Sequence, residues 1–226
     1  MVIIYRSSQS MKGSGRIGQG ILIISFMLLF VQSHGQFQFD YFKLALQWTP
    51  TTCAVSTCNQ TKFSQFPQEF TIHGLWPSTY AYPQPNWCQP RLLYDTNNTQ
   101  FIPLKNQLNA NWPDMIKPTN DIFWGHEFEK HGTCMTSNQA DYFITTLNLK
   151  SQLIPNVKAA IGYAPSRMTR NIQDFMTSLI RAYRFQPVIV CDALAEVWLC
   201  FDNNRRLRNC PRPWKINCNT FISLLA

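Results

Sequence analysis

Residues 41–48 read YFKLALQW and residues 69–75 read EFTIHGL, and these two segments decide the fold class. In both, apolar side chains alternate with polar or small ones, which is the period of a β-strand with one buried face. In the first segment the even-numbered positions are apolar, whereas Lys43, Ala45 and Gln47 point the other way. We therefore expect a half-buried strand over residues 41–48 and a second alternating segment over residues 69–75.

Helices and further strands follow along the chain. Helical spacing of apolar residues or helix-capping signals predict helices over 119–132, 138–153 and 170–183, and short apolar runs predict strands over 187–191 and 196–201. Strands and helices are segregated rather than strictly alternating, which is typical of an α+β domain. We expect one disulfide-bonded domain, with a mostly antiparallel central sheet flanked by helices.

The composition excludes several classes of protein. Hydrophobic residues make up 45% of the chain and charged residues 14%, which is too apolar for a disordered chain. Gly and Pro form no repeat, so collagen-like and low-complexity arrays are excluded. A length of 226 residues suits a single domain with a sizeable core.

The first 35 residues are typical of a secretory signal peptide. Three basic and no acidic residues precede the apolar run 21–31, and small residues follow it. As a helix this run rises about 16 Å, short of a bilayer core of ~30 Å, which disfavours a signal anchor. We expect residues 1–35 to be removed and residues 36–226 to be secreted without a membrane anchor. Met11 is an alternative initiator that would give a more usual signal length.

The mature chain is basic. Removing the three positive charges of the signal from the formal charge of +8 leaves +5. A positive secreted protein favours an anionic partner, such as nucleic acid or an anionic polysaccharide. The alternative is that the charge serves solubility alone.

Cysteines and sequons agree with an oxidising compartment. All eight cysteines lie in the mature chain, and an even number there indicates four disulfides. Spacing does not choose among the roughly one hundred pairings that eight cysteines allow. A zinc site is disfavoured because the chain has no C-x-x-C pair. Asn59 and Asn97 each begin a glycosylation sequon, so we expect N-glycans at both.

The segment FWGHEFEKHG, residues 123–132, concentrates titratable side chains. Because successive helical residues turn by about 100°, four of them fall on one side of a helix: His126, Glu127, Lys130 and His131. A zinc protease would need a histidine where Lys130 stands, so that hypothesis fails. The plain alternative is a solvated helix face with ion pairs one turn apart.

Two imidazoles, an ammonium and a carboxylate suit phosphoryl transfer. That reaction needs a base, an acid and positive charge on the phosphorane oxygens, and imidazole titrates near neutral pH. RNA carries its own nucleophile, the 2′-hydroxyl, so this set of groups needs neither metal nor cofactor. The 16 Phe, 8 Tyr and 7 Trp of the chain supply rings that can stack bases.

The segment FTIHGLWP, residues 70–77, and the segment Phe123–Cys134 together resemble the two active-site motifs of the ribonuclease T2 family. Both match without a gap and in the family's order, and weaker similarity extends over most of the mature chain. The resemblance implies a secreted endoribonuclease, an RNA lyase and hydrolase. Such an enzyme cleaves single-stranded RNA through a 2′,3′-cyclic phosphate, without a metal.

The resemblance also implies roles for single residues. His131 resembles the general base on the 2′-hydroxyl, and His73 resembles the general acid on the 5′ leaving oxygen. His126 would hold the phosphate, while Glu127 and Lys130 would stabilise the pentacoordinate state. Four further side chains would bind substrate: Gln47, Trp76, Phe123 and Trp124. The implied disulfides are Cys53–Cys58, Cys88–Cys134, Cys191–Cys218 and Cys200–Cys210.

Within the family, the chain is most similar to the plant pistil S-RNases. Eight mature cysteines, a basic mature chain and the segment EVWLCFD at residues 196–202 support this subgroup. It implies a monomeric pistil determinant of gametophytic self-incompatibility, with an S-locus F-box protein as partner. Two alternatives stay open. One is an extracellular S-like ribonuclease for defence or phosphate recovery. The other, disfavoured because both histidines are present, is a non-enzymatic secreted RNA- or glycan-binding protein.

Overall fold

The computed structural model describes residues 38–55, 58, 66–162, 169–191 and 196–223, all within the unit Gly35–Ala226. The expected signal peptide and the Asn59 sequon lie outside the described residues. In the described part of the chain no helix is long and apolar enough to cross a membrane.

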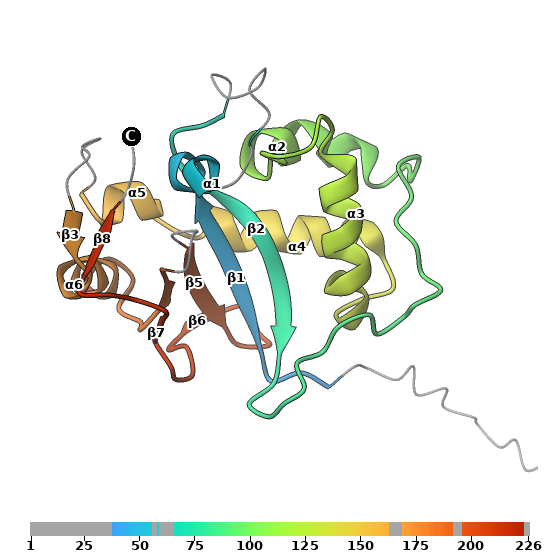
Figure 1. Ribbon diagram of the computed structural model, residues 1–226. Coiled ribbons are helices and arrows are strands. Elements are labelled where there is room, and N and C mark those ends of the chain that lie inside the picture. Colours follow the sequence, from blue (N-terminus) through green and yellow to red (C-terminus); the bar gives the residue numbers. More distant parts are fainter. Residues whose placement is uncertain (1–37, 56–57, 59–65, 163–168, 192–195, 224–226) are drawn as a thin grey trace, which may run out of the picture. The chain divides into compact units, whose positions relative to one another are not determined.

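The described elements are eight strands, six α-helices and two short 3₁₀ helices (Figure 1). The strands are β1 Tyr41–Trp48, β2 Phe70–Ser78, β3 Thr169–Asn171, β4 Val188–Val190, β5 Glu196–Phe201, β6 Leu207–Arg208, β7 Lys215–Ile216 and β8 Phe221–Ser223. The helices are α1 Thr49–Val55, η2 Ile102–Leu104, α2 Lys105–Asn111, α3 Asp121–Lys130, η3 Gly132–Cys134, α4 Gln139–Ser151, α5 Val157–Ala160 and α6 Ile172–Tyr183.

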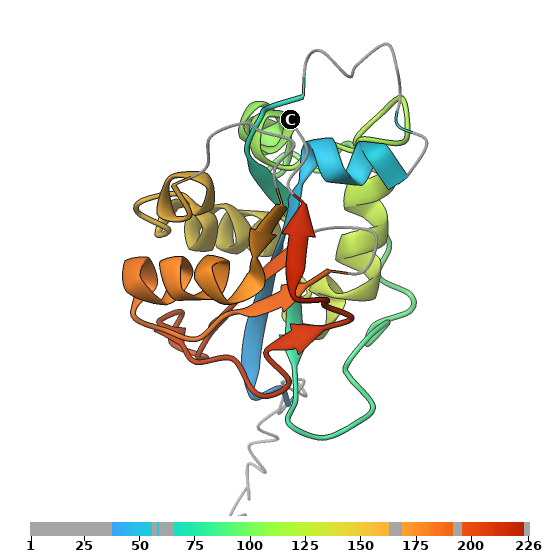
Figure 2. The same ribbon diagram turned by 60° about the vertical axis from the view of Figure 1, so that its left-hand side comes forward.

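The main sheet has the strand order β2-β1-β5-β4-β7, and β6 pairs with β5. Its pairs are antiparallel except β4 with β7, and β3 and β8 form a separate antiparallel pair. Figure 2 shows α4, α5 and α6 on one side of β1 and α3 on the other. The α+β class and the mostly antiparallel sheet are confirmed.

The expectation that β1 is half-buried is wrong. The even-numbered residues, such as Leu44 and Leu46, are buried on the face that α4 covers, as predicted. On the other face Ala45 is completely buried and Gln47 is 6% exposed. The reason is that β1 lies between β2 and β5 in the sheet. Its second face is covered by the polar and aromatic side chains of the candidate site.

A β-bulge interrupts the pairing of β1 with β2. Ala45 pairs with Gly74 and Leu46 pairs with Ile72, so His73 is an extra residue without a partner across the ladder. A bulge redirects the side chain that it carries. With the bulge, Ile72 and Leu75 both belong to the core although two residues separate them. His73, one of those two residues, reaches the face opposite α4.

The helices lie close to the predicted positions. α3 is shorter than the range 119–132, and Asn120 occupies its N-cap without a capping side-chain bond, since its Oδ1 accepts from the amide of Asp114 instead. α4 begins after Asn138, whose side chain accepts from two amides of the first turn. α6 buries its apolar stripe in the core as predicted.

The four disulfides are the pairs that the resemblance implied. They join Cys53 to Cys58, Cys88 to Cys134, Cys191 to Cys218 and Cys200 to Cys210. Cys134 ends η3, directly after α3, so its bond to Cys88 ties the end of that helix to the preceding loop.

Candidate active site

The fold brings His73 and His131 next to the same indole ring, that of Trp76. The ring centroid of Trp76 lies 5.2 Å from that of His73 and 5.4 Å from that of His131. His73 comes from the bulge of β2, and His131 is the C-cap residue of α3 rather than part of the helix proper. His126 lies one turn earlier on α3, exposed, with its ring 5.6 Å from that of Trp87.

His73 lies between two buried carboxylates. Its Nδ1 is 2.5 Å from Oε1 of Glu196, and its Nε2 is 3.9 Å from Oε1 of Glu127. Burial by itself lowers the pKa of His73, but the hydrogen bond and charge of Glu196, with the charge of Glu127, outweigh it and raise that pKa. The indole of Trp112 also donates to the backbone carbonyl of His73, at 2.9 Å. His73 is therefore held in place and favours its protonated form.

Glu127 is 2% exposed and accepts a hydrogen bond from the indole of Trp76 on Oε2, at 3.0 Å. Burial raises the pKa of Glu127, while the charge of His73 and the bond from Trp76 oppose the shift. The glycine at 74 makes this approach possible. A Cβ at Gly74 would lie 2.0 Å from Oε2 of Glu127 and 2.4 Å from the Trp76 indole nitrogen. No side chain fits there without displacing one of them.

His131 has the opposite electrostatic environment. Burial, followed by the positive charges of Lys130 and His73, lowers the pKa of His131 to about 3. Its Nδ1 is buried and has no hydrogen-bond partner among the described residues. At neutral pH the imidazole of His131 is therefore uncharged and able to accept a proton.

Two lysines add positive charge near His126 and His131. Burial, followed by the charge of Lys130, lowers the pKa of His126 and of His131. Lys43 was not predicted as a site residue. Its Nζ lies 5.1 Å from the ring of Trp198 and 5.9 Å from that of Trp76, and burial lowers its pKa. The alternation of β1 did contain a signal, because Lys43 shares a strand face with Gln47.

Glu196 is the other site residue that sequence reasoning missed. Its importance depends on the antiparallel pairing of β5 with β1, which places it opposite Gln47. No local sequence pattern predicts the pairing of β5 with β1, since the two strands are separated by most of the chain.

A cavity of about 390 Å³ is lined in part by His73 and His126, but not by His131. It collects four of the predicted residues: Gln47, His73, Phe123 and His126. The remaining lining was not predicted and includes Thr52, Asp114, Lys117 and the exposed Ile122. Its size and mixed lining suit a ring with polar edges, such as a nucleobase.

The expectation that Trp124 contacts substrate is wrong. Its side chain is 1% exposed and packs in the core against Phe101. Its indole nitrogen donates to the carbonyl of Trp112 at 2.8 Å. On α3 it lies on the side that faces the core, whereas its neighbour Phe123 lines the cavity.

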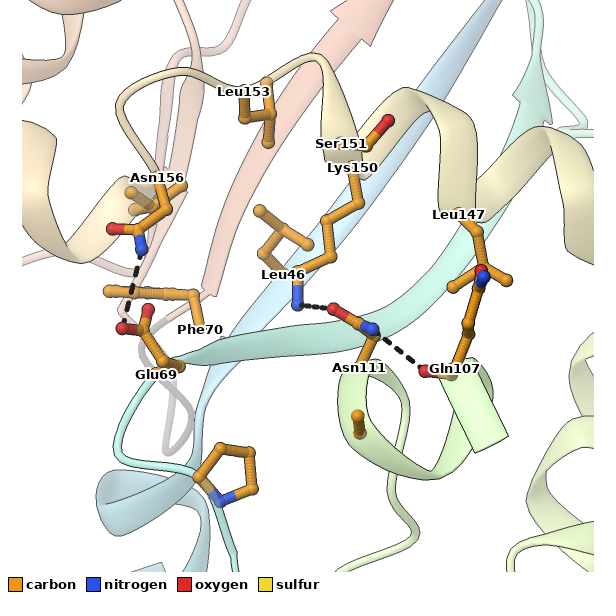
Figure 3. A pocket seen from close by; sticks show the side chains of 13 residues that line it. Leu46, Glu69, Phe70, Gln107, Asn111, Leu147, Lys150, Ser151, Leu153 and Asn156 are labelled. Atoms are coloured by element: carbon orange, nitrogen blue, oxygen red, sulfur yellow. Dashed lines mark hydrogen bonds between the residues drawn. The ribbon is translucent and has the colours of Figure 1, made fainter. Parts of the chain in front are cut away.

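A separate cavity of about 460 Å³ lies on the other face of the sheet (Figure 3). Leu46 and Phe70 contribute to its lining, and Lys150 of α4 donates to the side chain of Asn111 at 2.9 Å. None of the predicted site residues lines this cavity, because Leu46 and Gln47 are neighbours on β1 and point to opposite faces.

Comparison with known sequences matches residues 39–210 to the Ribonuclease T2 family. The chain belongs to the ribonuclease T2 family. It is therefore an endoribonuclease of that family, whose members act on RNA.

Two relatives and one solved structure illustrate the similarity. Ribonuclease 3 of Arabidopsis thaliana is 32% identical over 84% of this chain and 91% of its own length. Ribonuclease S-7 of Nicotiana alata is 30% identical over 84% of this chain and 90% of its own length. The crystal structure of RNase NT in complex with 5′-AMP superposes with a TM-score of 0.73 and 25% identity, covering 83% of this chain and 98% of that one.

Proposed function

We propose that this endoribonuclease cleaves single-stranded RNA by a two-histidine reaction without a metal, giving a 2′,3′-cyclic phosphate that is then hydrolysed to a 3′-phosphate. The observation that carries the proposal is the separation of two pKa values in one site. That of His131 is lowered to about 3 and that of His73 is raised. Environments that push two titratable groups apart in this way assign a base and an acid.

The first step is the attack of the 2′-hydroxyl on the phosphorus. His131, neutral above pH ~3 by its environment, takes the hydroxyl proton. His73, protonated, gives a proton to the departing 5′ oxygen. In the second step water replaces the 5′ oxygen, and the two histidines exchange roles.

The remaining groups bind and stabilise. Lys130, together with Lys43 beside the indole rings of Trp76 and Trp198, opposes the negative charge that grows on the phosphorane oxygens, while His126 holds the phosphate. Glu127 is held by the indole of Trp76, 3.9 Å from Nε2 of His73, and stabilises the pentacoordinate state together with Lys130. Gln47 and Phe123 line the adjoining cavity, which takes a base of the substrate.

The test is to incubate the purified mature protein with single-stranded RNA in excess EDTA and to identify the product ends. We expect cleavage with 2′,3′-cyclic or 3′-phosphate ends. Loss of activity in EDTA that returns with a divalent cation would contradict the metal-free reaction. Products with 5′-phosphate ends would contradict the use of the 2′-hydroxyl as nucleophile.

We further infer that the protein is secreted as a monomeric glycoprotein and acts as a pistil S-RNase, with an S-locus F-box protein as its pollen-side partner. The basic charge of residues 36–226 and the similarity to Ribonuclease S-7 support this role. Asn97 is exposed, so a glycan there meets no packing obstacle. The second sequon begins at Asn59.

The alternative is an S-like ribonuclease for defence or phosphate recovery. The relatives that keep this alternative open include an extracellular and an intracellular ribonuclease of Solanum lycopersicum. Expression decides between the two. Transcripts confined to pistils, with arrest of pollen tubes that carry the matching allele, are expected for the S-RNase. Expression induced in leaves or roots by wounding or phosphate starvation, with no effect on pollen, would establish the alternative.

A further inference from the structure

The carboxylate of Glu196 is buried and hydrogen-bonded within the site, and the reaction proposed above gives it no role. Glu196 opens β5 and is 5% exposed. One oxygen contacts Nδ1 of His73 at 2.5 Å, and the other accepts from the indole of Trp198 at 2.7 Å. A buried carboxylate is costly unless its oxygens are hydrogen-bonded, and here both are.

The chemistry of these partners fixes where the protons are. An indole nitrogen only donates, so Oε2 of Glu196 accepts from Trp198. Oε1 then accepts from a protonated Nδ1 of His73. The other nitrogen of the ring, Nε2, points away from Glu196, toward Glu127 at 3.9 Å. When His73 has given up one proton, the proton that stays on the ring is the one on Nδ1.

We propose that Glu196 is the positioning residue of the general acid: it keeps a proton on Nδ1 of His73 and thereby presents Nε2 to the leaving oxygen of RNA. The proposal rests on the role of His73 proposed above. Glu196 touches no reacting atom and acts through the imidazole alone.

Glu127 does not fill this role. It faces the opposite nitrogen at 3.9 Å, beyond hydrogen-bonding distance, and its Oε2 is already bound by Trp76. The charged groups around the His73 ring are therefore Glu196 from β5 and Glu127 and Lys130 from α3, with His126 and His131 nearby. Of these, only Glu196 bonds the ring directly.

The sheet makes room for this contact. Between His73 on β2 and Glu196 on β5 lies β1, where Ala45 pairs with Gly74 on one side and Trp198 on the other. Because the side chain of Ala45 is small, the side chains of His73 and Glu196 can meet across β1.

The experiment is the variant Glu196→Gln, which keeps the shape of the side chain and removes its charge. Glu69→Gln is the matched control, because Glu69 lines the cavity on the other face of the sheet. Two quantities are measured: the pKa of His73 by NMR of its ring, and kcat/KM for a short RNA between pH 4 and 9. The wild-type ring nitrogens also show directly whether Nδ1 keeps its proton when Nε2 loses one.

We expect Glu196→Gln to lower the pKa of His73, and the alkaline limb of kcat/KM with it, by about one to three pH units. The sign follows because a carboxylate partner favours imidazolium and an amide does not. Glu69→Gln should leave both unchanged. A folded Glu196→Gln protein with the wild-type pKa and limb would overturn the proposal, as would equal shifts in both variants.

Two further outcomes remain informative. If Glu196→Gln fails to fold, the wild-type spectrum decides, and a neutral ring protonated on Nε2 would overturn the proposal. If the wild-type protein does not cleave RNA, the proposed function fails, while the Nδ1 proton and the His73 pKa still test the role of Glu196 in holding the ring.

Discussion

At the scale of single residues, the site depends on two histidines whose proton affinities differ. His131 is neutral in most of the accessible pH range, whereas His73 favours its charged form. The rate should therefore be high between the two pKa values and fall on the alkaline side as His73 loses its proton. Burial and nearby positive charges lower the pKa of His131, whereas the carboxylates of Glu196 and Glu127 outweigh burial and raise the pKa of His73.

Replacing either histidine should remove turnover without unfolding the protein. We expect His73→Ala and His131→Ala each to lower kcat by about 100-fold or more, because each removes one acid–base step. RNA cleavage assays and thermal melts check this. Near wild-type kcat in either folded variant would contradict the assigned roles.

Lys130→Ala should lower kcat by about 100-fold and change KM little, because its charge is needed most in the transition state. Lys158→Ala is the control, since that ammonium bonds the carbonyl of Gln68 away from the histidines. If KM and kcat were affected equally, Lys130 would be a simple phosphate contact.

At the scale of elements, the β1–β2 pair and the end of α3 carry the site. The bulge turns His73 out of the ladder, and Gly74 beside it lets Glu127 and Trp76 approach each other. Position 74 therefore tolerates no Cβ, because a Cβ would collide with Glu127 and Trp76 and not because of the backbone conformation.

Gly74→Ala should displace Glu127 or Trp76. Overpacking of this kind destabilises by about 1–3 kcal/mol, so the melting temperature should fall and turnover of the folded protein should fall with it. Calorimetry and cleavage assays on the same sample check both. A Gly74→Ala protein with unchanged stability and activity would mean that the β2–α3 contact is looser than described.

Sequence reasoning placed these elements well but missed their irregularities. Periodicity located β1, α4 and α6, because a regular element repeats its pattern over many residues. It could not locate the bulge, which is a relation between two strands. The family resemblance wrongly assigned Trp124 to substrate binding, because membership of a motif does not tell which side of α3 faces the core. Glu196 was missed because its neighbour His73 lies far away in the chain.

At the scale of the whole molecule, the sheet separates two cavities, and His73 and His126 line only one of them. Four disulfides hold the loops around this sheet, one of them directly behind α3. Which cysteines are bonded to each other could be predicted only from the family resemblance, because the spacing of the cysteines along the chain allows many alternative pairings.

RNA binding should weaken as salt rises. With two to four phosphate contacts, the slope of log affinity against log salt should be about −1.5 to −3 for a single strand. Titrations between low and moderate salt, using the inactive His131→Ala variant, measure it. A flat response would show that the cationic groups near the histidines do not contact the phosphates.

The bulge has a consequence for how this enzyme can lose its activity. If residue 73 alone were deleted, Ile72 would be joined directly to Gly74. All the pairs between β1 and β2 would then be retained, in a regular ladder without a bulge. The pairing of β1 with β2 does not require His73, but its deletion would remove one partner each from the buried carboxylates of Glu196 and Glu127 and from the indole of Trp112. One in-frame codon deletion therefore removes the proposed general acid and leaves the pairing of β1 with β2 in register, so an inactive relative with this strand pair is a single mutational step away.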